Sequence, residues 1–361
     1  MSFAELRGAI SEGRWAEALE RYEAAVLGVL GTTPDAAPVA RWARAYDALS
    51  EQLTAERQRA LAKQSSAELS GEDALAVAGL VYGARSFYIA SRLLRTHGLA
   101  PGSIHDLGCG WGAGALAGMA AGASAAVLSD VDARVLERAS LLFAALGLSA
   151  TTVLGSFERA RPASNAVLAY SLNELRARGG DGQAVVSELL RSLGPGGRLF
   201  VFDPGTQECG AAMSALRDGL ADRVRVLGPC THQAPCPLRD SPLGWCHFTL
   251  PIPLGPVASA IAHSAHKQHH VVRFSWLALE VATPSPASSG RRVLSLQREK
   301  GKTRLLGCGA GGAEMLTRLD RAAAADEVLE SGDILELGEG VERRGDGLRL
   351  GPAAILHRRQ L

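Results

Sequence analysis

A short apolar run that enters a glycine-rich turn is the feature that most constrains the fold of this chain. Ser103–Leu107 has the composition of a strand, and it continues into Gly108-Cys109-Gly110-Trp111-Gly112, with a glycine at every second position. Glycine lets the backbone turn tightly and approach a ligand closely. A small-residue helix is expected from about residue 112 to 121, and its first N–H groups would point at that ligand. The sequence therefore predicts a strand–loop–helix unit that holds a cofactor.

Strands and helices alternate beyond this loop. Further strands are expected at 125–128, 152–154, 166–170 and 198–202, with helices between the second and third and between the fourth and fifth strands. This alternation predicts an α/β fold with a parallel, doubly wound sheet. The preceding chain reads as helical, with apolar residues at helical spacing: Leu6, Ile10, Leu19, Tyr22 and Val26.

After about Gly228 the alternation stops. Cysteines, histidines and prolines crowd into 229–256, a strand is expected from Arg273, and glycine-punctuated short strands follow, including 333–337 and 348–355. We expect four segments: an N-terminal helical region (1–75), a Rossmann-like domain (76–228), a Cys-rich segment (229–272) and a small β-rich C-terminal module (273–361).

Three motifs occur in order within the expected domain. Asp106-Leu107-Gly108-Cys109-Gly110 comes first, and Asp130 follows at the end of the next strand, where its carboxylate can accept hydrogen bonds from ribose hydroxyls. Asp132 then occupies the expected helix N-cap. The third motif is the turn Leu193-Gly194-Pro195-Gly196-Gly197. Together they resemble the motifs of class I S-adenosylmethionine-dependent methyltransferases, and they argue against a nicotinamide site. The alternative is a fold of this kind that has lost its cofactor.

The resemblance implies S-adenosylmethionine as cofactor. The expected cofactor contacts are Asp106, Gly108, Gly110, Gly112, Asp130, Ser156 and Tyr170. Ser156 departs from the pattern, because many such enzymes carry an acidic residue near the adenine and this chain has Gly155-Ser156-Phe157.

Catalytic residues are weakly marked. Methyl transfer needs mainly an acceptor held in line with the sulfonium methyl group, and a base only if the acceptor must lose a proton. Asn173 and Glu174, after the fourth strand, are the candidates to orient an acceptor, and capping of the following helix is the preferred interpretation.

Three cysteines lie close together in a polar, proline-rich loop: Cys230, Cys236 and Cys246. Thiolates bind soft metals, and this density is a poor way to build an apolar core. The spacing is not C-x-x-C, so a common zinc ribbon fits badly. Cys308 is the first choice for a fourth ligand, and His232 or His247 the second.

At this point the chain resembles the mitochondrial small-ribosomal-subunit methyltransferase-like proteins (the Rsm type) and their bacterial relatives. The residues that carry the resemblance include Tyr82–Tyr88, the glycine loop, Phe202–Thr206 and above all the pattern C-x5-C-P-L followed by W-C-H-F. The resemblance implies that Cys230, Cys236, Cys246 and Cys308 hold a 4Fe–4S cluster. It also implies that the protein assists assembly of the small ribosomal subunit by contacting ribosomal RNA.

Charge supports the RNA contact only locally. The formal net charge is +1, and one dense basic cluster stands out: Arg291, Arg292, Arg298, Lys300, Lys302 and Arg304. A solvated strand face is an equal interpretation of it. No feature indicates a membrane or DNA partner, and the N-terminus lacks the apolar region of a secretory signal, so a cytoplasmic protein is expected.

Two other functions stay open at this stage. One is an active methyltransferase of a small molecule or protein, in which zinc clips the cysteine loop. The other is an assembly factor for which the fold is only a scaffold.

Overall fold

The computed structural model of the 361-residue chain describes residues 2–55, 71–156, 162–239, 241–268, 270–284, 290–322, 328–345, 347–352 and 354–359. It divides into two compact units. The first comprises Met1–Val201 with Pro251–Val272, and the second comprises Phe202–Leu250 with Arg273–Leu361. The expected division into four segments stays a prediction.

The first unit opens with helices, as predicted. They are α1 (Phe3–Glu12), α2 (Trp15–Val29), the 3-10 turn η1 (Pro34–Ala36), α3 (Val39–Ala55), α4 (Glu72–Val77), the π-helix η3 (Ala78–Gly83) and α5 (Ala84–His97). Ser2 begins α1 with a capping box that includes Glu5, and Gly13 ends it in the left-handed conformation. The five apolar residues whose spacing predicted helices are all buried. The amphipathic pattern therefore identified the core-facing side correctly.

One helical stretch, Glu72–His97, is long and apolar enough to cross a membrane by length and composition alone. In the structure 78% of its most apolar window is buried inside the protein. A core helix of a soluble protein passes the same test.

A mixed sheet forms the centre of the α/β fold. Its strands are β1 (Ile104–Leu107), β2 (Ala126–Asp130), β3 (Thr151–Leu154), β4 (Asn165–Ala169), β5 (Arg198–Pro204), β6 (Arg225–Gly228), β7 (Phe248–Pro251) and β8 (Val271–Glu280). Hydrogen bonds order them β3-β2-β1-β4-β5-β8-β6, and β7 pairs with β8. β1 is parallel to β2 and to β4, as the alternation predicted, and β2 is parallel to β3.

The prediction of a wholly parallel sheet is wrong at the β6 side. β8 pairs with β6 in antiparallel register, with Arg225 opposite Glu280. A parallel partner would need a strand–helix–strand crossover, and the alternation that supplies such crossovers ends at β6. The strand expected from Arg273 onward is β8, so it belongs to this sheet and not to the β-rich sheet that follows.

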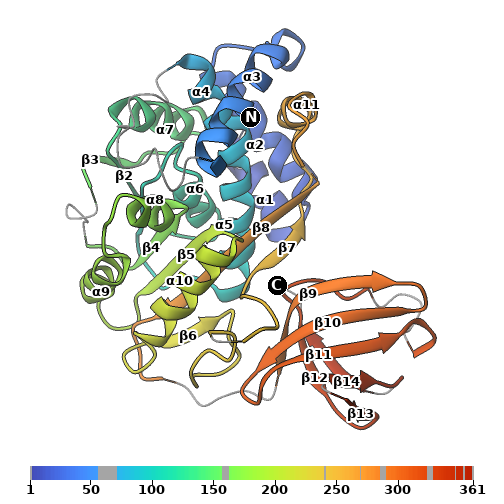
Figure 1. Cartoon of the computed structure of the whole chain (residues 1–361). Coiled ribbons are helices and arrows are strands. Elements are labelled where there is room, and N and C mark those ends of the chain that lie inside the picture. The colour runs from blue at the N-terminus through green and yellow to red at the C-terminus, as the bar shows by residue number, and fades with distance from the viewer. Residues whose placement is uncertain are drawn as a thin grey trace. The chain divides into compact units, whose positions relative to one another are not determined.

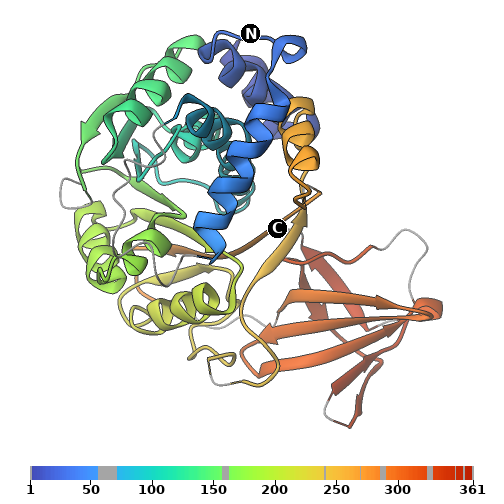
Figure 2. The same ribbon diagram turned by 45° about the horizontal axis from the view of Figure 1, so that its top comes forward.

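The helices of this part of the chain are α6 (Ala113–Ala120), α7 (Ala133–Ala145), α8 (Ser171–Ala177), α9 (Gly182–Leu193), α10 (Gln207–Asp218) and α11 (Pro256–Ser264). α6 and α7 follow their strands as predicted. The single helix expected between β4 and β5 is divided into α8 and α9, and α10 and α11 were not predicted. Within the first unit α6 packs on β1 and β2, α7 on β2 and β3, and α8 and α9 on β4 (Figure 1). α11 lies beside α2 and α3, although more than 200 residues separate it from them in the chain (Figure 2). The buried carboxylate of Glu23 makes this possible, because it accepts hydrogen bonds from the N–H groups of Val257 and Ala258 at the start of α11.

The second unit ends in a β-rich module, as predicted. Its strands are β9 (Arg291–Glu299), β10 (Lys302–Gly309), β11 (Gly312–Leu319), β12 (Ile334–Leu337), β13 (Val341–Arg344), β14 (Gly347–Leu350) and β15 (Ile355–Arg359), and the 3-10 turn η5 (Asp320–Ala322) follows β11. They form a second sheet in the order β13-β14-β11-β10-β9-β12-β15 around a core that includes Val293, Leu305 and Leu316. The single strand expected over 348–355 is divided in two, because Gly351 and Pro352 interrupt it.

Candidate functional site

The glycine loop connects β1 to α6 as the sequence predicted. Gly108, Gly110 and Gly112 have φ values of +67°, +51° and +74°, which favour glycine over any other residue. The N–H groups of Gly108 and Cys109 both donate to the carbonyl of Ser129 at 2.9 Å. The loop is therefore anchored to β2 at the edge where the parallel strands end, and the N–H of Gly112 donates within the loop to the carbonyl of Cys109 at 2.8 Å.

Gly108 is also required by a close approach. A Cβ atom at this position would lie 2.7 Å from Cβ of Ser171, the first residue of α8. The Ser171 hydroxyl donates to the carbonyl of Leu107 at 2.9 Å. The ends of β1 and β4 are thereby joined directly beneath the loop.

Asp130 holds the loop from the second strand. Its carboxylate accepts hydrogen bonds from the N–H of Gly110 at 3.0 Å and from the N–H of Asp132 at 3.1 Å. Burial raises the pKa of Asp130 above its ordinary value. Asp132 is the N-cap of α7 and accepts from the N–H of Arg134, which confirms the predicted cap.

Val131 was missed by the sequence reasoning. It follows Asp130 and is 51% exposed. The sequence feature that could have identified it is an apolar residue directly after Asp130, the acidic residue that ends β2. An apolar side chain here can pack against a flat ring that is held beside Asp130.

Asp106 lies beneath the loop with no exposed surface. Its Oδ2 accepts from the N–H of Ala115 at 2.8 Å, while Oδ1 is buried with no hydrogen-bond partner among the described residues. Burial raises the pKa of Asp106 to about 7. The geometry makes this carboxylate a support for the start of α6, and its contact with a cofactor stays a prediction.

Tyr170 joins β4 to α8 in the left-handed conformation, with φ +62° and ψ 0°. A bulky residue there is strained, and such strain is concentrated at functional sites. Neither Asn173 nor Glu174 is the N-cap of α8, because Tyr170 holds that position and both lie within the first helical turns. Ser156 is exposed two residues beyond β3. Strand ends thus bring the loop, Asp130 and Tyr170 to one edge of the sheet, and their roles stay predictions.

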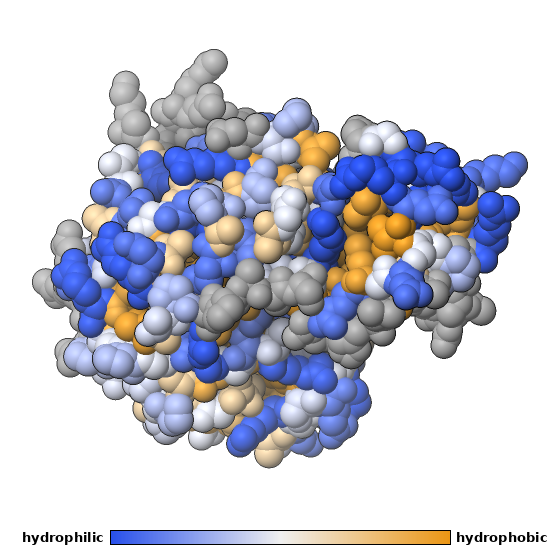
Figure 3. All heavy atoms as spheres, turned by 90° about the horizontal axis from the view of Figure 1, so that it is seen from below, coloured by the Kyte–Doolittle hydropathy of each residue, from blue (hydrophilic) through white to orange (hydrophobic). Residues whose placement is uncertain are grey.

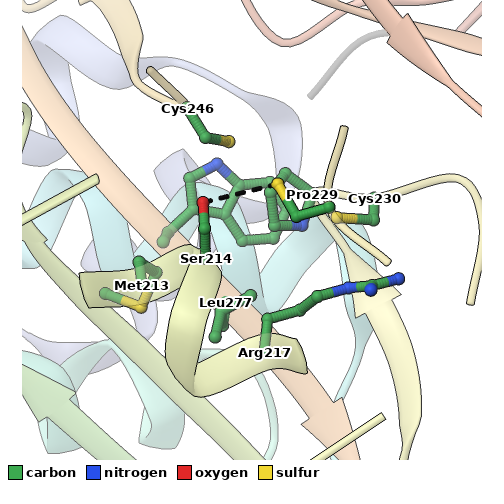
Figure 4. A pocket seen from close by; sticks show the side chains of 9 residues that line it. Met213, Ser214, Arg217, Pro229, Cys230, Cys246 and Leu277 are labelled. Carbon is green, nitrogen blue, oxygen red and sulfur yellow. Dashed lines mark hydrogen bonds between the residues drawn. The ribbon is translucent and has the colours of Figure 1, made fainter. Parts of the chain in front are cut away.

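A second site lies wholly within the second unit. Cys230, Cys236 and Cys246 line one small cavity. The remaining lining residues are Met213, Ser214, Arg217, Pro229, Trp276 and Leu277. Figure 4 shows the side chains of Cys230, Cys246 and Ser214 gathered around one space, with Arg217 extending beside Cys230. The three cysteines that are close in sequence are therefore close in space.

Cys308 approaches the same three thiols from β10. It is 8% exposed and stands opposite Arg292 of β9, which donates to the carbonyl of Pro229, the residue before Cys230. Burial raises the pKa of the Cys246 thiol, and the charges of Cys230, Cys308 and Cys236 raise it further. Burial is the largest cause of the raised pKa of Cys308, followed by the charges of Cys230 and Cys236. Like charges act in this way only at short range. Among the described residues, however, no three Cys, His, Asp or Glu side chains are arranged closely enough to hold a metal ion.

His232 and His247, the alternative fourth ligands, each have one ring nitrogen at hydrogen-bond distance from a backbone carbonyl. Nδ1 of His232 lies 3.0 Å from the carbonyl of Ala234, and Nδ1 of His247 lies 3.1 Å from the carbonyl of Trp245. The remaining two cysteines do not line the cavity: Cys109 is buried in the glycine loop and Cys209 in α10.

The predicted basic cluster is largely paired with acidic residues. Arg291 lies 2.8 Å from Glu314, and Glu299 lies 3.0 Å from Lys302 and 3.3 Å from Arg304. Arg292 is buried. Arg298, Lys300 and Arg304 are exposed, and of these three Arg304 is the one paired with Glu299 among the described residues. On the face shown in Figure 3, hydrophilic residues surround an apolar area over the second sheet.

Comparison with protein families shows to which family this chain belongs. The model of the family described as "Mitochondrial small ribosomal subunit Rsm22" matches residues 91–313, more than half of the chain, and this span includes the glycine loop and all four cysteines of the second site. The chain belongs to the Rsm22 family. The resemblance inferred from the motifs is thus confirmed. The expected cytoplasmic location is not, since the description of the Rsm22 family names a mitochondrial assembly.

Two of the solved structures similar to this Rsm22-family chain are methyltransferases by their descriptions. One is the C-terminal domain of precorrin-6Y C5,15-methyltransferase from Rhodobacter capsulatus, with 15% identity over 53% of this chain and 88% of that one and a TM-score of 0.34. Another is ribosomal protein L11 methylase from Lactobacillus delbrueckii subsp. bulgaricus, with 12% identity over 56% and 80% and a TM-score of 0.34. Scores this low carry no argument about activity. No curated protein matches the sequence significantly.

Proposed function

We propose that this Rsm22-family protein is a methyltransferase-like assembly factor of the small ribosomal subunit, which binds S-adenosylmethionine at the glycine loop and a 4Fe–4S cluster at Cys230, Cys236, Cys246 and Cys308. The observation that carries the proposal is the convergence of these four thiols in one part of the second unit. We expect the protein in the same cellular compartment as the ribosome whose small subunit it helps to assemble.

The chemistry of the donors fits a cluster better than a single zinc ion. Four thiolates on one tetrahedral zinc lie about 3.8 Å from each other, given a Zn–S bond of about 2.3 Å. The described residues contain no set of three that is arranged for one ion. In a cubane each thiolate binds a different iron, so the sulfur atoms lie farther apart, around a larger centre. Three of the four thiols line one cavity, and four cysteine thiolates are the donor set of a cubane.

A bound cluster would either transfer electrons or cross-link the loop after β6 to strand β10. Three of its ligands come from the loop that follows β6, and the fourth comes from β10. The loop has little regular structure of its own, so cross-linking it to a strand restricts the chain in the same way as a structural metal. The second role requires no redox change.

The first unit supports the cofactor half of the proposal. Asp130 and the loop it holds lie at the carboxyl end of parallel strands, where nucleotide-type ligands bind in α/β sheets. The exposed Val131 offers an apolar surface for an adenine ring beside a carboxylate that can accept from ribose hydroxyls. Transfer of the methyl group needs no further residue if the acceptor is already nucleophilic.

The ribosomal half rests on the description of the family. The paired state of Arg291, Lys302 and Arg304 reduces the charge available to phosphates, so the contact with ribosomal RNA depends on fewer cations than the sequence suggests. Arg298 and Lys300 are exposed and have no acidic partner among the described residues, whereas the exposed Arg304 is paired with Glu299. Co-sedimentation with small subunits over a salt series measures this contact, and Arg298→Ala with Lys300→Ala should lower the slope against salt by roughly two phosphate contacts.

Anaerobic purification with iron, sulfide and zinc analysis tests the cluster. We expect broad absorption near ~400 nm and roughly four irons per chain, lost in Cys236→Ser and in Cys308→Ser. Cys209→Ser is the matched control, since Cys209 is buried in α10 of the same unit, outside the loop and the strand β10 that carry the four proposed ligands. It should keep the full iron content.

Two other results of the metal analysis would contradict the cluster. One zinc per chain would favour an active methyltransferase with a structural zinc clip. A protein with neither metal would leave the fold as a scaffold. Isothermal titration with S-adenosylmethionine is independent of both, and binding without a cluster would preserve the cofactor half alone.

A further inference from the structure

Two buried arginines flank the cysteine cavity. Arg217, on α10, is 1% exposed and lines the cavity together with Cys230 and Cys236. Its Nη1 pairs with Asp218 at 2.7 Å and its Nη2 donates to the carbonyl of His232 at 2.8 Å. Its Nε is buried and has no hydrogen-bond partner among the described residues. Desolvation of this guanidinium is offset on one side by Asp218, and negative charge on the thiols of the cavity would stabilise it further.

Arg292 reaches the same thiols from the second sheet. It is 3% exposed and stands directly opposite Cys308 in the antiparallel pair of β9 and β10. Side chains opposite each other in such a pair share a face of the sheet and lie in contact range. Arg292 also donates to the carbonyl of Pro229, the residue before Cys230, at 2.8 Å, and lies over the ring of Trp276, another residue of the cavity wall.

Ser214 adds a hydrogen bond at the cavity wall. It lies one helical turn before Arg217 on α10. Its hydroxyl accepts from the Cys236 thiol at 3.4 Å and donates to the carbonyl of Gly210 at 3.0 Å. When Cys236 is a thiolate its proton is gone, so the hydroxyl must turn from Gly210 to donate to the sulfur. Asp218, at the end of the same helix, accepts from the N–H of Cys236 at 3.0 Å. One face of α10 therefore positions Cys236 by its backbone and contacts its sulfur by a side chain.

We propose that Arg217, Arg292 and Ser214 are positioning residues that stabilise the negative charge of the four-cysteine cluster and raise its reduction potential. The inference rests on the proposed function, since it requires the cluster. Four thiolates outweigh the positive charge of the iron–sulfur core, and reduction adds one more negative charge. Buried cations and hydrogen bonds to sulfur stabilise the reduced state more than the oxidised state.

Redox titration of the anaerobically purified full chain, followed by electron paramagnetic resonance of the reduced cluster, tests this inference. In Arg217→Met we expect a midpoint shifted to more negative potential by about 59 mV or more, which is a tenfold change in the ratio of reduced to oxidised cluster. Ser214→Ala should shift the midpoint in the same direction by less. Iron and sulfide content should stay at the wild-type level in both variants.

Arg225→Met is the matched control. Arg225 is a cation of the same unit that does not line the cavity, and its loss also leaves one carboxylate, Glu280, without this arginine, as Asp218 is left by Arg217→Met. Its midpoint should equal that of the wild type.

Three outcomes would overturn the inference. They are an unchanged midpoint in Arg217→Met, an equal shift in Arg225→Met, and, if Arg217→Met does not load a cluster, an unchanged midpoint in Ser214→Ala. A wild-type protein that contains no cluster is a different result, visible in its spectrum before any titration. It would remove the proposed function and this inference together.

Discussion

The buried carboxylate of Asp106 makes the stability of the first unit depend on pH in a predictable direction. Asp106 has no exposed surface, and one of its oxygens has no hydrogen-bond partner among the described residues. Its folded-state pKa is about 7, against 3.8 for the ordinary side chain. Replacement by asparagine keeps the shape and an acceptor for the N–H of Ala115 but removes the ionisation.

The size of the effect follows from linkage. Because the folded pKa is raised, the folded state binds a proton more tightly than the unfolded state, and this stabilisation is lost as pH rises from about 4 to about 7. A shift from 3.8 to about 7 corresponds to about 4 kcal/mol over the whole window. Between about pH 5 and about pH 8 the wild type should lose about 2–3 kcal/mol relative to Asp106→Asn.

Urea unfolding of both proteins at the two pH values, followed by tryptophan fluorescence, measures this difference. Trp111 is buried in the glycine loop and reports on the region around Asp106. Asp222→Asn, at a side chain that is 80% exposed, controls for the loss of a carboxylate as such. The reasoning is refuted if the difference between wild type and Asp106→Asn is the same at both pH values.

Two other substitutions test the packing and the anchoring of the loop. Gly79→Ala places a Cβ atom 2.6 Å from Cε2 of Trp111, so we expect a loss of about 1–3 kcal/mol in thermal unfolding; an unchanged melting temperature would mean that the π-helix relaxes freely. Asp130→Ala removes the acceptor of the Gly110 and Asp132 N–H groups, and S-adenosylmethionine should bind at least about tenfold more weakly by titration calorimetry. Affinity equal to that of the wild type would show that Asp130 contacts neither the ribose nor a loop that matters for binding.

Local pattern predicted the first unit well and the second unit less well. The amphipathic spacing of Leu6, Ile10 and Leu19 and the alternation around the glycine loop depend on neighbours in sequence, and the structure has helices and parallel strands there. The antiparallel return of β8 was missed, because a strand of the same composition pairs in either direction. Only the long-range arrangement of the chain decides which.

The sequence by itself determined the chemistry that each site offers. Glycines at 108, 110 and 112 permit the positive φ values of the loop, and the four cysteines supply the donors, because conformational freedom and ligand type belong to the residue. Tertiary structure decided how these groups are surrounded. It buried Asp106, paired most of the predicted basic cluster with Glu299 and Glu314, and brought Arg217 from a helix and Arg292 from a strand to the thiols. Burial and charge pairing depend on residues that are distant in the chain, so no reading of local pattern can supply them.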